Sequence, residues 1–213
     1  MHNTCKVQDI VMKDSNKMLR EHFNKNQPTQ TISCFRSLHD FVLDPDFVFE
    51  MFSQGGNSNS GFQMYHLNHA SRNESRDELK KLWETGQPSI ELLKLLSSQY
   101  TFIIREAYYH FNLLDEMRQI YLSHFRCHSN TNLYTSRPTS SAFIKHADPH
   151  PVFAYQLYGA KNWLLYPDNS ITPLEICVST GDVLFIPQGI QHHAVAVTDF
   201  SVHASVSVEV DRS

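Results

Sequence analysis

The sequence has little of what marks several protein classes. Its 213 residues include only 7 Gly and 9 Pro, which excludes collagen-like and low-complexity chains. Lys and Arg number 18 against 22 Asp and Glu, so the basic excess typical of nucleic-acid-binding proteins is missing and we expect no nucleic-acid partner. No run approaches the roughly 18 consecutive apolar residues of a membrane helix. We therefore expect no membrane partner either.

Cysteines are few and scattered, with no CxxC motif and no disulfide framework among Cys5, Cys34, Cys127 and Cys177. The opening MHNTCKVQDI lacks the apolar stretch of a signal peptide. Both observations predict a reducing, cytoplasmic location. Apolar residues make up 41% of the chain, enough for the core of one domain with at most a flanking extension.

The first half of the chain is helical in pattern, and the periodicity of its apolar residues and its capping signals predict the helices. One predicted helix, over residues 11–23, either docks on the domain by one apolar stripe or forms a homodimer contact. The composition of residues 53–61 predicts a mobile loop. The other helices are predicted over 37–52 (two short helices separated at Asp44-Pro45), 75–86, 89–99 and 113–125.

The second half is rich in short β-type runs separated by turn residues, which favours an antiparallel sandwich or barrel over βαβ units. The sequence thus predicts an α+β protein whose functional half is β. A helical extension is expected over residues 1–35 and the main domain over 36–213, with its core at 129–213. Strands are predicted over 100–109, 132–136, 142–146, 152–159, 161–167, 173–179, 182–187, 193–197 and 201–210.

The segment His146-Ala147-Asp148 is the first candidate for chemistry. Alternate residues of a strand share a face, so His146 and Asp148 could bind one ion together. A third ligand is available from His192 or His193 in PQGIQHH. Two histidines and one carboxylate leave three positions open, as non-haem Fe(II) oxygenases require. The alternative is that these are ordinary polar residues near a turn.

A longer ordered pattern surrounds this segment: Asn132, Tyr134, His146, Asp148, Val152, Phe153, Gln156, Gly159, Lys161, Trp163, Gly181, Asp182, Leu184, Pro187, Gly189, His192, Ser201 and His203. In order and spacing it resembles the cupin-type, JmjC-like oxygenases that depend on Fe(II) and 2-oxoglutarate, most strongly the ribosomal-protein hydroxylases and their bacterial relatives. The resemblance implies a double-stranded β-helix, the jelly-roll barrel of cupins, preceded and flanked by N-terminal helices.

By the same resemblance, His146, Asp148 and His192 are the metal ligands, and His192 is preferred to His193 because it ends the P-x-G-x-x-H spacing. Lys161 is implied to bind the distal carboxylate of 2-oxoglutarate. Polar contacts to this co-substrate are implied for Asn132, Tyr134 and Ser207. His150 could border the site, and His203 is expected to be an interior histidine.

The implied reaction uses O₂ and 2-oxoglutarate to hydroxylate a C–H bond of an amino-acid side chain in a protein or peptide, or of a free amino acid. The HxD pair favours hydroxylation over demethylation. The family's glycine-containing loop is replaced by Thr135–Ser141 without glycine, so the lining near the substrate entrance should differ, and we do not carry the ribosomal substrate over. Two alternatives stay open: a metal-dependent cupin isomerase or lyase, against which Lys161 argues, and a non-catalytic binding module, against which the intact ligand set argues.

Overall fold

The computed structural model describes residues 33–36, 42–55, 61–66, 72–125, 127–140 and 144–210. The predicted helix over 11–23, and with it the proposed dimer contact, lies outside these residues. None of the described helices is long and apolar enough to cross a membrane.

The helices precede the barrel, as the sequence predicts. Helix α4 begins after Ser89, whose hydroxyl accepts a hydrogen bond from the Leu92 amide at 3.2 Å and so caps it. The first described helix begins at Pro45, a residue suited to the first helical turn, and includes residues 53–55, which were expected in a loop. The α-helices are α2 (Pro45–Gly55), α3 (Arg72–Glu84), α4 (Ile90–Leu96) and α5 (Asn112–Phe125), with short 3₁₀ helices η1 (Ala107–Tyr109) and η2 (Pro167–Asn169).

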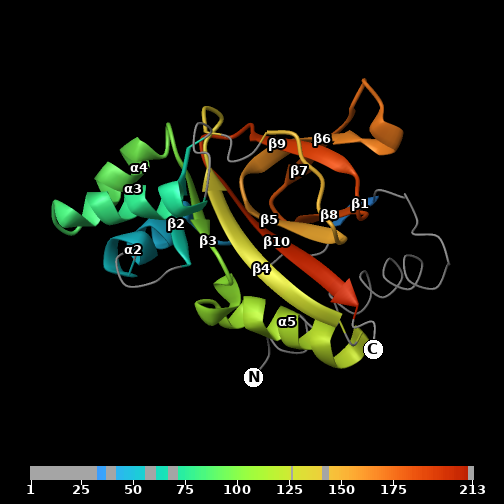
Figure 1. Ribbon diagram of the computed structural model, residues 1–213, viewed down its shortest axis with the longest axis horizontal. Coiled ribbons are helices and arrows are strands. Elements are labelled where there is room, and N and C mark those ends of the chain that lie inside the picture. The colour runs from blue at the N-terminus through green and yellow to red at the C-terminus, as the bar shows by residue number, and fades with distance from the viewer. Residues whose placement is uncertain are drawn as a thin grey trace.

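Two antiparallel sheets carry the rest of the described chain (Figure 1). A seven-stranded sheet has the order β1-β8-β5-β10-β4-β3-β2, and a three-stranded sheet the order β7-β6-β9. In Figure 1 the strands β2 and β3 extend the larger sheet away from the barrel, toward α2, α3 and α4. The strands are β1 (Ser33–Arg36), β2 (Phe62–Tyr65), β3 (Thr101–Ile104), β4 (Cys127–Ser136), β5 (Val152–Tyr158), β6 (Ala160–Tyr166), β7 (Leu174–Ser179), β8 (Asp182–Ile186), β9 (Gln191–Ala196) and β10 (Ser201–Val210).

Several strand predictions were wrong in detail. The strand predicted over 100–109 ends at Ile104, because Glu106 takes a left-handed conformation (φ 51°) and η1 follows. Of the strand predicted over 142–146, the described part forms only an isolated bridge between His146 and His192. Strand β4 starts at Cys127 instead of 132, and neither β1 nor β2 was predicted.

The two faces of the larger sheet differ in polarity, and this difference positions the site. One face carries buried apolar residues such as Ile104 and Leu133, packed against the helices. Phe102 contacts Phe49 and Phe52 of α2 edge-on, with ring centroids 5.2 and 5.0 Å away. The opposite face presents polar residues toward the three-stranded sheet. Strand alternation therefore separates a helix-packed core from a polar cavity.

Candidate functional site

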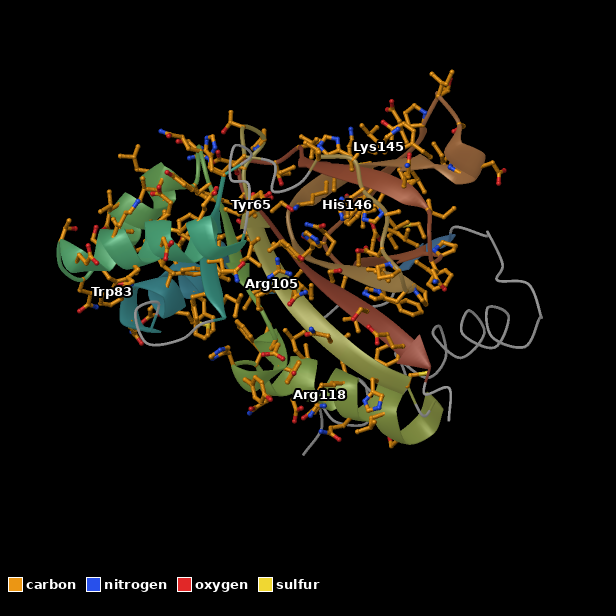
Figure 2. All side chains as sticks on the ribbon, in the orientation of Figure 1. Tyr65, Trp83, Arg105, Arg118, Lys145 and His146 are labelled. Carbon is orange, nitrogen blue, oxygen red and sulfur yellow. The ribbon has the colours of Figure 1, made fainter. Side chains whose placement is uncertain are left out.

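A cavity of about 520 Å³ opens between the two sheets. Its wall combines residues of both sheets with the segment before β5, and Figure 2 shows Arg105 and His146 near the centre of the molecule. The lining residues from the larger sheet and its connections are Gln63, Arg105, Glu106, Asn130, Asn132, Tyr134, Val152, His203, Ser205, Ser207 and Glu209. Those from the smaller sheet and the segment before β5 are His146, Asp148, His150, Lys161, Trp163, His192 and Ala194.

Three of the predicted site residues form one cluster. One possible ligand atom from each of His146, Asp148 and His192 lies within 4.8 Å of the others. His192 Nε2 is 3.6 Å from the Asp148 carboxylate. The backbones of the two histidines exchange hydrogen bonds of 3.1 and 2.7 Å, which brings residues 46 positions apart side by side. This backbone bridge, and not the predicted strand, orients His146.

Both imidazoles are oriented in the same way. Nδ1 of His146 lies 3.0 Å from the carbonyl oxygen of Ile144, and Nδ1 of His192 lies 3.0 Å from that of Ile190. A carbonyl can only accept, so each Nδ1 carries the proton and each Nε2 is the unprotonated nitrogen whose lone pair can bind a metal. This is the arrangement usual for metal-binding histidines. The donor set of two imidazole nitrogens and a carboxylate fits a divalent transition metal.

Burial keeps this cluster ready for a cation. His192 is only 5% exposed, and its burial lowers the pKa of the imidazole; nearby His146 lowers it further, against the opposing effects of the Ile190 carbonyl and Asp148. His192 is therefore neutral at pH 7, the form that binds metal. Its neighbour His193 does not line the cavity, so only the first histidine of the pair faces the site.

Lys161 occupies the same cavity from β6. The residue is 5% exposed, and no described residue forms an ion pair or side-chain hydrogen bond with it. Burial lowers the pKa of its ammonium group to about 7. A buried cation without a partner is costly, and an anionic ligand would remove that cost. The preceding Gly159 makes the turn into β6 with φ +66°, where a Cβ would lie 2.1 Å from the Phe200 carbonyl oxygen.

Three aromatic side chains connect the Lys161 side of the cavity with the metal-type cluster. Trp163 lies 5.8 Å from His192 and 5.5 Å from His203 between ring centroids, and His203 stacks on Tyr134 at 4.8 Å. The Trp163 Nε1 and His203 Nδ1 atoms are buried and have no hydrogen-bond partner in the described part of the chain. His203 is interior, as expected, and Trp163 belongs to a small apolar core cluster; both side chains also line the cavity. Alternate residues of a strand share a face, so Trp163 faces the same way as Lys161 on β6, and His203 the same way as Ser205 and Ser207 on β10. This alternation was the sequence signal that both rings face the cavity.

The remaining predicted co-substrate residues also line the cavity but are already engaged. The Asn132 side-chain oxygen accepts from the Glu106 amide at 3.2 Å. The Ser207 hydroxyl donates to the Asn130 carbonyl and accepts from its amide, each at 3.3 Å. Ser207 lies four residues beyond His203 on β10, about 13 Å at the usual strand rise. Ser207 therefore lies further along β10 than His203, which pairs with Tyr134 of β4.

Two further cavity residues were missed by the sequence reading. Gln63 of β2 is fully buried, and Arg105, just after β3, is half-buried. Both lie on the extension of the larger sheet. Because the two residues are 42 positions apart in the chain, no local sequence motif predicts their contact.

Comparison with known proteins agrees with this site. Residues 106–213 match the JmjC domain family. Two curated relatives carry the name bifunctional lysine-specific demethylase and histidyl-hydroxylase NO66. The one from Dictyostelium discoideum is 29% identical over 43% of this chain, and the one from Aedes aegypti is 33% identical over 39%. These matches cover only 22% and 16% of the relatives' own lengths.

A solved structure shows the same fold. The ribosomal oxygenase YcfD from Escherichia coli, in complex with cobalt and 2-oxoglutarate, superposes with a TM-score of 0.60 at 14% identity, over 94% of this chain and 52% of that one. The likeness confirms the predicted jelly-roll barrel with preceding helices. The family match covers more than half of the sequence and includes the histidine–aspartate cluster and Lys161. The chain belongs to the JmjC domain family.

Proposed function

We propose that the protein is an Fe(II)- and 2-oxoglutarate-dependent oxygenase that hydroxylates a C–H bond. The substrate is an amino-acid side chain in a protein or peptide, or a free amino acid. One observation carries the proposal: the His146, Asp148 and His192 cluster shares a cavity with a buried cation, Lys161, that has no acidic partner among the described residues. A metal alone would explain the cluster, but not the lysine.

The chain's own residues have distinct roles in this proposal. His146 and His192 offer Nε2 lone pairs and Asp148 a carboxylate oxygen to Fe(II). Lys161 forms an ion pair with the distal carboxylate of 2-oxoglutarate and so recovers the cost of its burial. Trp163, between His192 and His203, fills space around the site and limits the entry of water.

When bound, Fe(II) and 2-oxoglutarate supply the oxidising power, because O₂ converts 2-oxoglutarate to succinate and CO₂ while one oxygen atom enters the substrate C–H bond. The protein's part is to orient the reactants. Asn132, Tyr134 and Ser207 remain proposed contacts, with Tyr134 the best placed, since it stacks on His203.

The relatives support this chemistry without defining the substrate. YcfD is a ribosomal oxygenase whose structure contains cobalt and 2-oxoglutarate, and this chain covers about half of it. The NO66 name includes both demethylase and histidyl-hydroxylase. The HxD pair leads us to propose hydroxylation. We also keep as proposals the division of the chain near residue 35 and the cytoplasmic location.

An anaerobic titration with Fe(II) and 2-oxoglutarate tests the proposal, with the visible charge-transfer absorption of the ternary complex as the signal. The band should form in the wild type, disappear in His192→Ala and weaken in Lys161→Met. His193→Ala is the matched control, because this neighbouring histidine does not line the cavity, and it should behave as the wild type.

Two other outcomes would redirect the assignment. Metal binding without 2-oxoglutarate binding would contradict the oxygenase and favour a metal-dependent cupin isomerase or lyase. Binding of neither ligand would favour a non-catalytic binding module.

A further inference from the structure

Arg105 and Gln63 lie together on the part of the larger sheet that extends beyond the barrel. The Arg105 amide donates to the Gly61 carbonyl at 2.9 Å, and Gln63 faces Ile103 across the β2–β3 pair. Arg105 and Gln63 both line the cavity. The cavity therefore has a second polar wall on β2 and β3, outside the smaller sheet that carries Lys161.

Gln63 has a buried side-chain amide whose oxygen and nitrogen differ in hydrogen bonding. Its side-chain oxygen accepts from Arg105 Nε at 3.4 Å, while its Nε2 has no hydrogen-bond partner among the residues that the structure describes, although Gln63 is fully buried. A buried N–H group without an acceptor is unfavourable and is rare in folded proteins. Since Gln63 lines the cavity, a ligand oxygen there would satisfy it.

Arg105 is a cation without an ion pair in the described part of the chain. A guanidinium has five N–H donors, and only Nε has a partner here, the Gln63 oxygen. The adjacent Glu106 forms no described ion pair with it: its carboxylate accepts from the Tyr108 hydroxyl at 3.2 Å, and its left-handed backbone directs its amide to Asn132. Several guanidinium donors are thus available to a ligand.

This donor pair is separate from the proposed co-substrate site. Lys161 projects from β6 of the three-stranded sheet, whereas Gln63 and Arg105 belong to the far end of the seven-stranded sheet. Strands β4 and β10 lie between β3 and the rest of the barrel, and they carry Tyr134 and His203 on the row of Gln63. We infer from this placement that a molecule of 2-oxoglutarate bound at Lys161 leaves these donors to a second ligand.

We propose that Arg105 and Gln63 bind a carboxylate group of the molecule that the cavity takes up beside 2-oxoglutarate. A planar guanidinium and a neighbouring amide N–H match the two oxygens of a carboxylate. That this molecule is the substrate to be hydroxylated rests on the proposed function. The carboxylate belongs either to a free or C-terminal α-carboxyl group or to an acidic side chain of a peptide.

Direct binding of small carboxylates to the full chain tests the site without any turnover. The probes are N-acetylglycine, its neutral analogue N-acetylglycinamide, and the peptide acetyl-Gly-Glu-Gly-amide, whose only carboxylate is a side chain. Calorimetry gives affinities, and the NMR signal of the Arg105 Nε–H group reports contact. Each titration uses the apo protein and the protein saturated with Zn(II) and 2-oxoglutarate.

We expect at least one carboxylate probe to shift the Arg105 signal and to bind about tenfold or more tightly than the neutral amide. Arg105→Gln should lose about tenfold in affinity, and Gln63→Leu a smaller factor. Arg105→Lys, which keeps the charge, should retain part of the binding and checks that the site still folds. Arg118→Gln is the matched control, because Arg118 pairs with Asp115 on α5, outside the cavity (Figure 2).

The two carboxylate probes distinguish the sources: tighter binding of N-acetylglycine indicates a terminal carboxyl group, and tighter binding of the peptide an acidic side chain. The inference is overturned if neither probe binds, if the neutral amide binds equally well, or if Arg105→Gln binds as the wild type. Displacement of the probe by 2-oxoglutarate would overturn it too. Failure of 2-oxoglutarate binding alone contradicts the proposed function, while the apo titration still tests Arg105.

Discussion

Lys161 and Arg105 are the lysine and arginine side chains that line one cavity from its two sheets, and they differ in burial and in hydrogen-bond partners. Lys161 is almost completely buried, has no described partner and has a pKa lowered to about 7 by that burial. Arg105 is half-buried and shares a hydrogen bond with Gln63. A guanidinium keeps its charge under all ordinary conditions, whereas a buried ammonium can lose its proton.

The comparison suggests two modes of anion recognition in one cavity. At Lys161 a ligand would complete an ion pair and restore a charge that burial disfavours, so binding and protonation are coupled. At Arg105 the charge exists before any ligand arrives, and recognition depends on the geometry of the donors. The proposed oxygenase needs both, since it binds a co-substrate and a substrate in adjacent places.

Removal of the metal should separate the two modes most strongly. We expect His192→Ala, or chelation of the metal, to weaken 2-oxoglutarate binding by at least about a hundredfold, because two charge-assisted contacts at the metal would be lost. Carboxylate binding at Arg105 should change little. Calorimetry of both ligands on the same preparation measures this contrast, and an equal loss at both places would show that the two cations serve a single site.

The backbone that supports Lys161 should be much less tolerant than turns elsewhere. Gly159→Ala should lower the free energy of unfolding by about 2–4 kcal/mol, because a Cβ there combines a left-handed φ with contact against a backbone oxygen. Gly189→Ala is the matched control: its φ is +82°, but nothing lies within 4 Å of the added Cβ. Chemical denaturation of both variants gives the difference, and equal losses would mean that the close packing at Gly159 is unimportant.

Loss of the buried cation should act on the co-substrate alone. Lys161→Met keeps most of the side-chain length but removes the charge. We expect the affinity for 2-oxoglutarate to fall by about ten- to a hundredfold, because one charge-assisted contact is lost. Binding of N-acetylglycine should stay within about twofold of the wild type, well below the change expected for one lost hydrogen bond. If Lys161→Met lost both ligands, both would bind at Lys161, and Arg105 would not form a second site.

Much of this site could be predicted from the sequence because its signals are local. The HxD spacing, the P-x-G-x-x-H spacing and the turn before Lys161 each lie within a few residues, and the structure brings all of them to one cavity. The reason given for His146 and Asp148 was wrong, however. They do not sit on a strand; a backbone bridge to His192 holds His146 in place.

The second wall of the cavity could not be predicted, for a physical reason. Strand β2 has only four residues, FQMY, and the loop-like run before it gives no sign that it joins a sheet. Gln63 and Arg105 face the cavity only because β2 and β3 add to β4 at the edge of the sheet. Such long-range pairing is decided by tertiary packing rather than by local propensity.

The last effect we predict is a pH dependence that belongs to Lys161 and has no counterpart at Arg105. The pKa of Lys161 is about 7 in the folded apo protein and near 10.5 when unfolded, so above pH 7 the unfolded chain binds more protons. The free energy of unfolding should therefore rise with pH, by at most about 1.4 kcal/mol per unit. Lys161 dominates the range from pH 7 to 9: burial lowers the pKa values of His192 and His203 from 6.5, so they contribute only near pH 7, and raises that of Cys127 to about 11, so it contributes only as the pH approaches 9.

Denaturation of the apo protein across that range measures the slope, and Lys161→Met should be flat while Arg105→Gln keeps the wild-type slope. Binding of 2-oxoglutarate should show the opposite trend, because its carboxylate needs the protonated ammonium. Its affinity should fall by up to about tenfold per pH unit above 7 in the wild type and should not change in Lys161→Met. Because guanidinium groups keep their charge in proteins, carboxylate binding at Arg105 should be constant. A carboxylate affinity that fell in parallel with that of 2-oxoglutarate would place both ligands at Lys161.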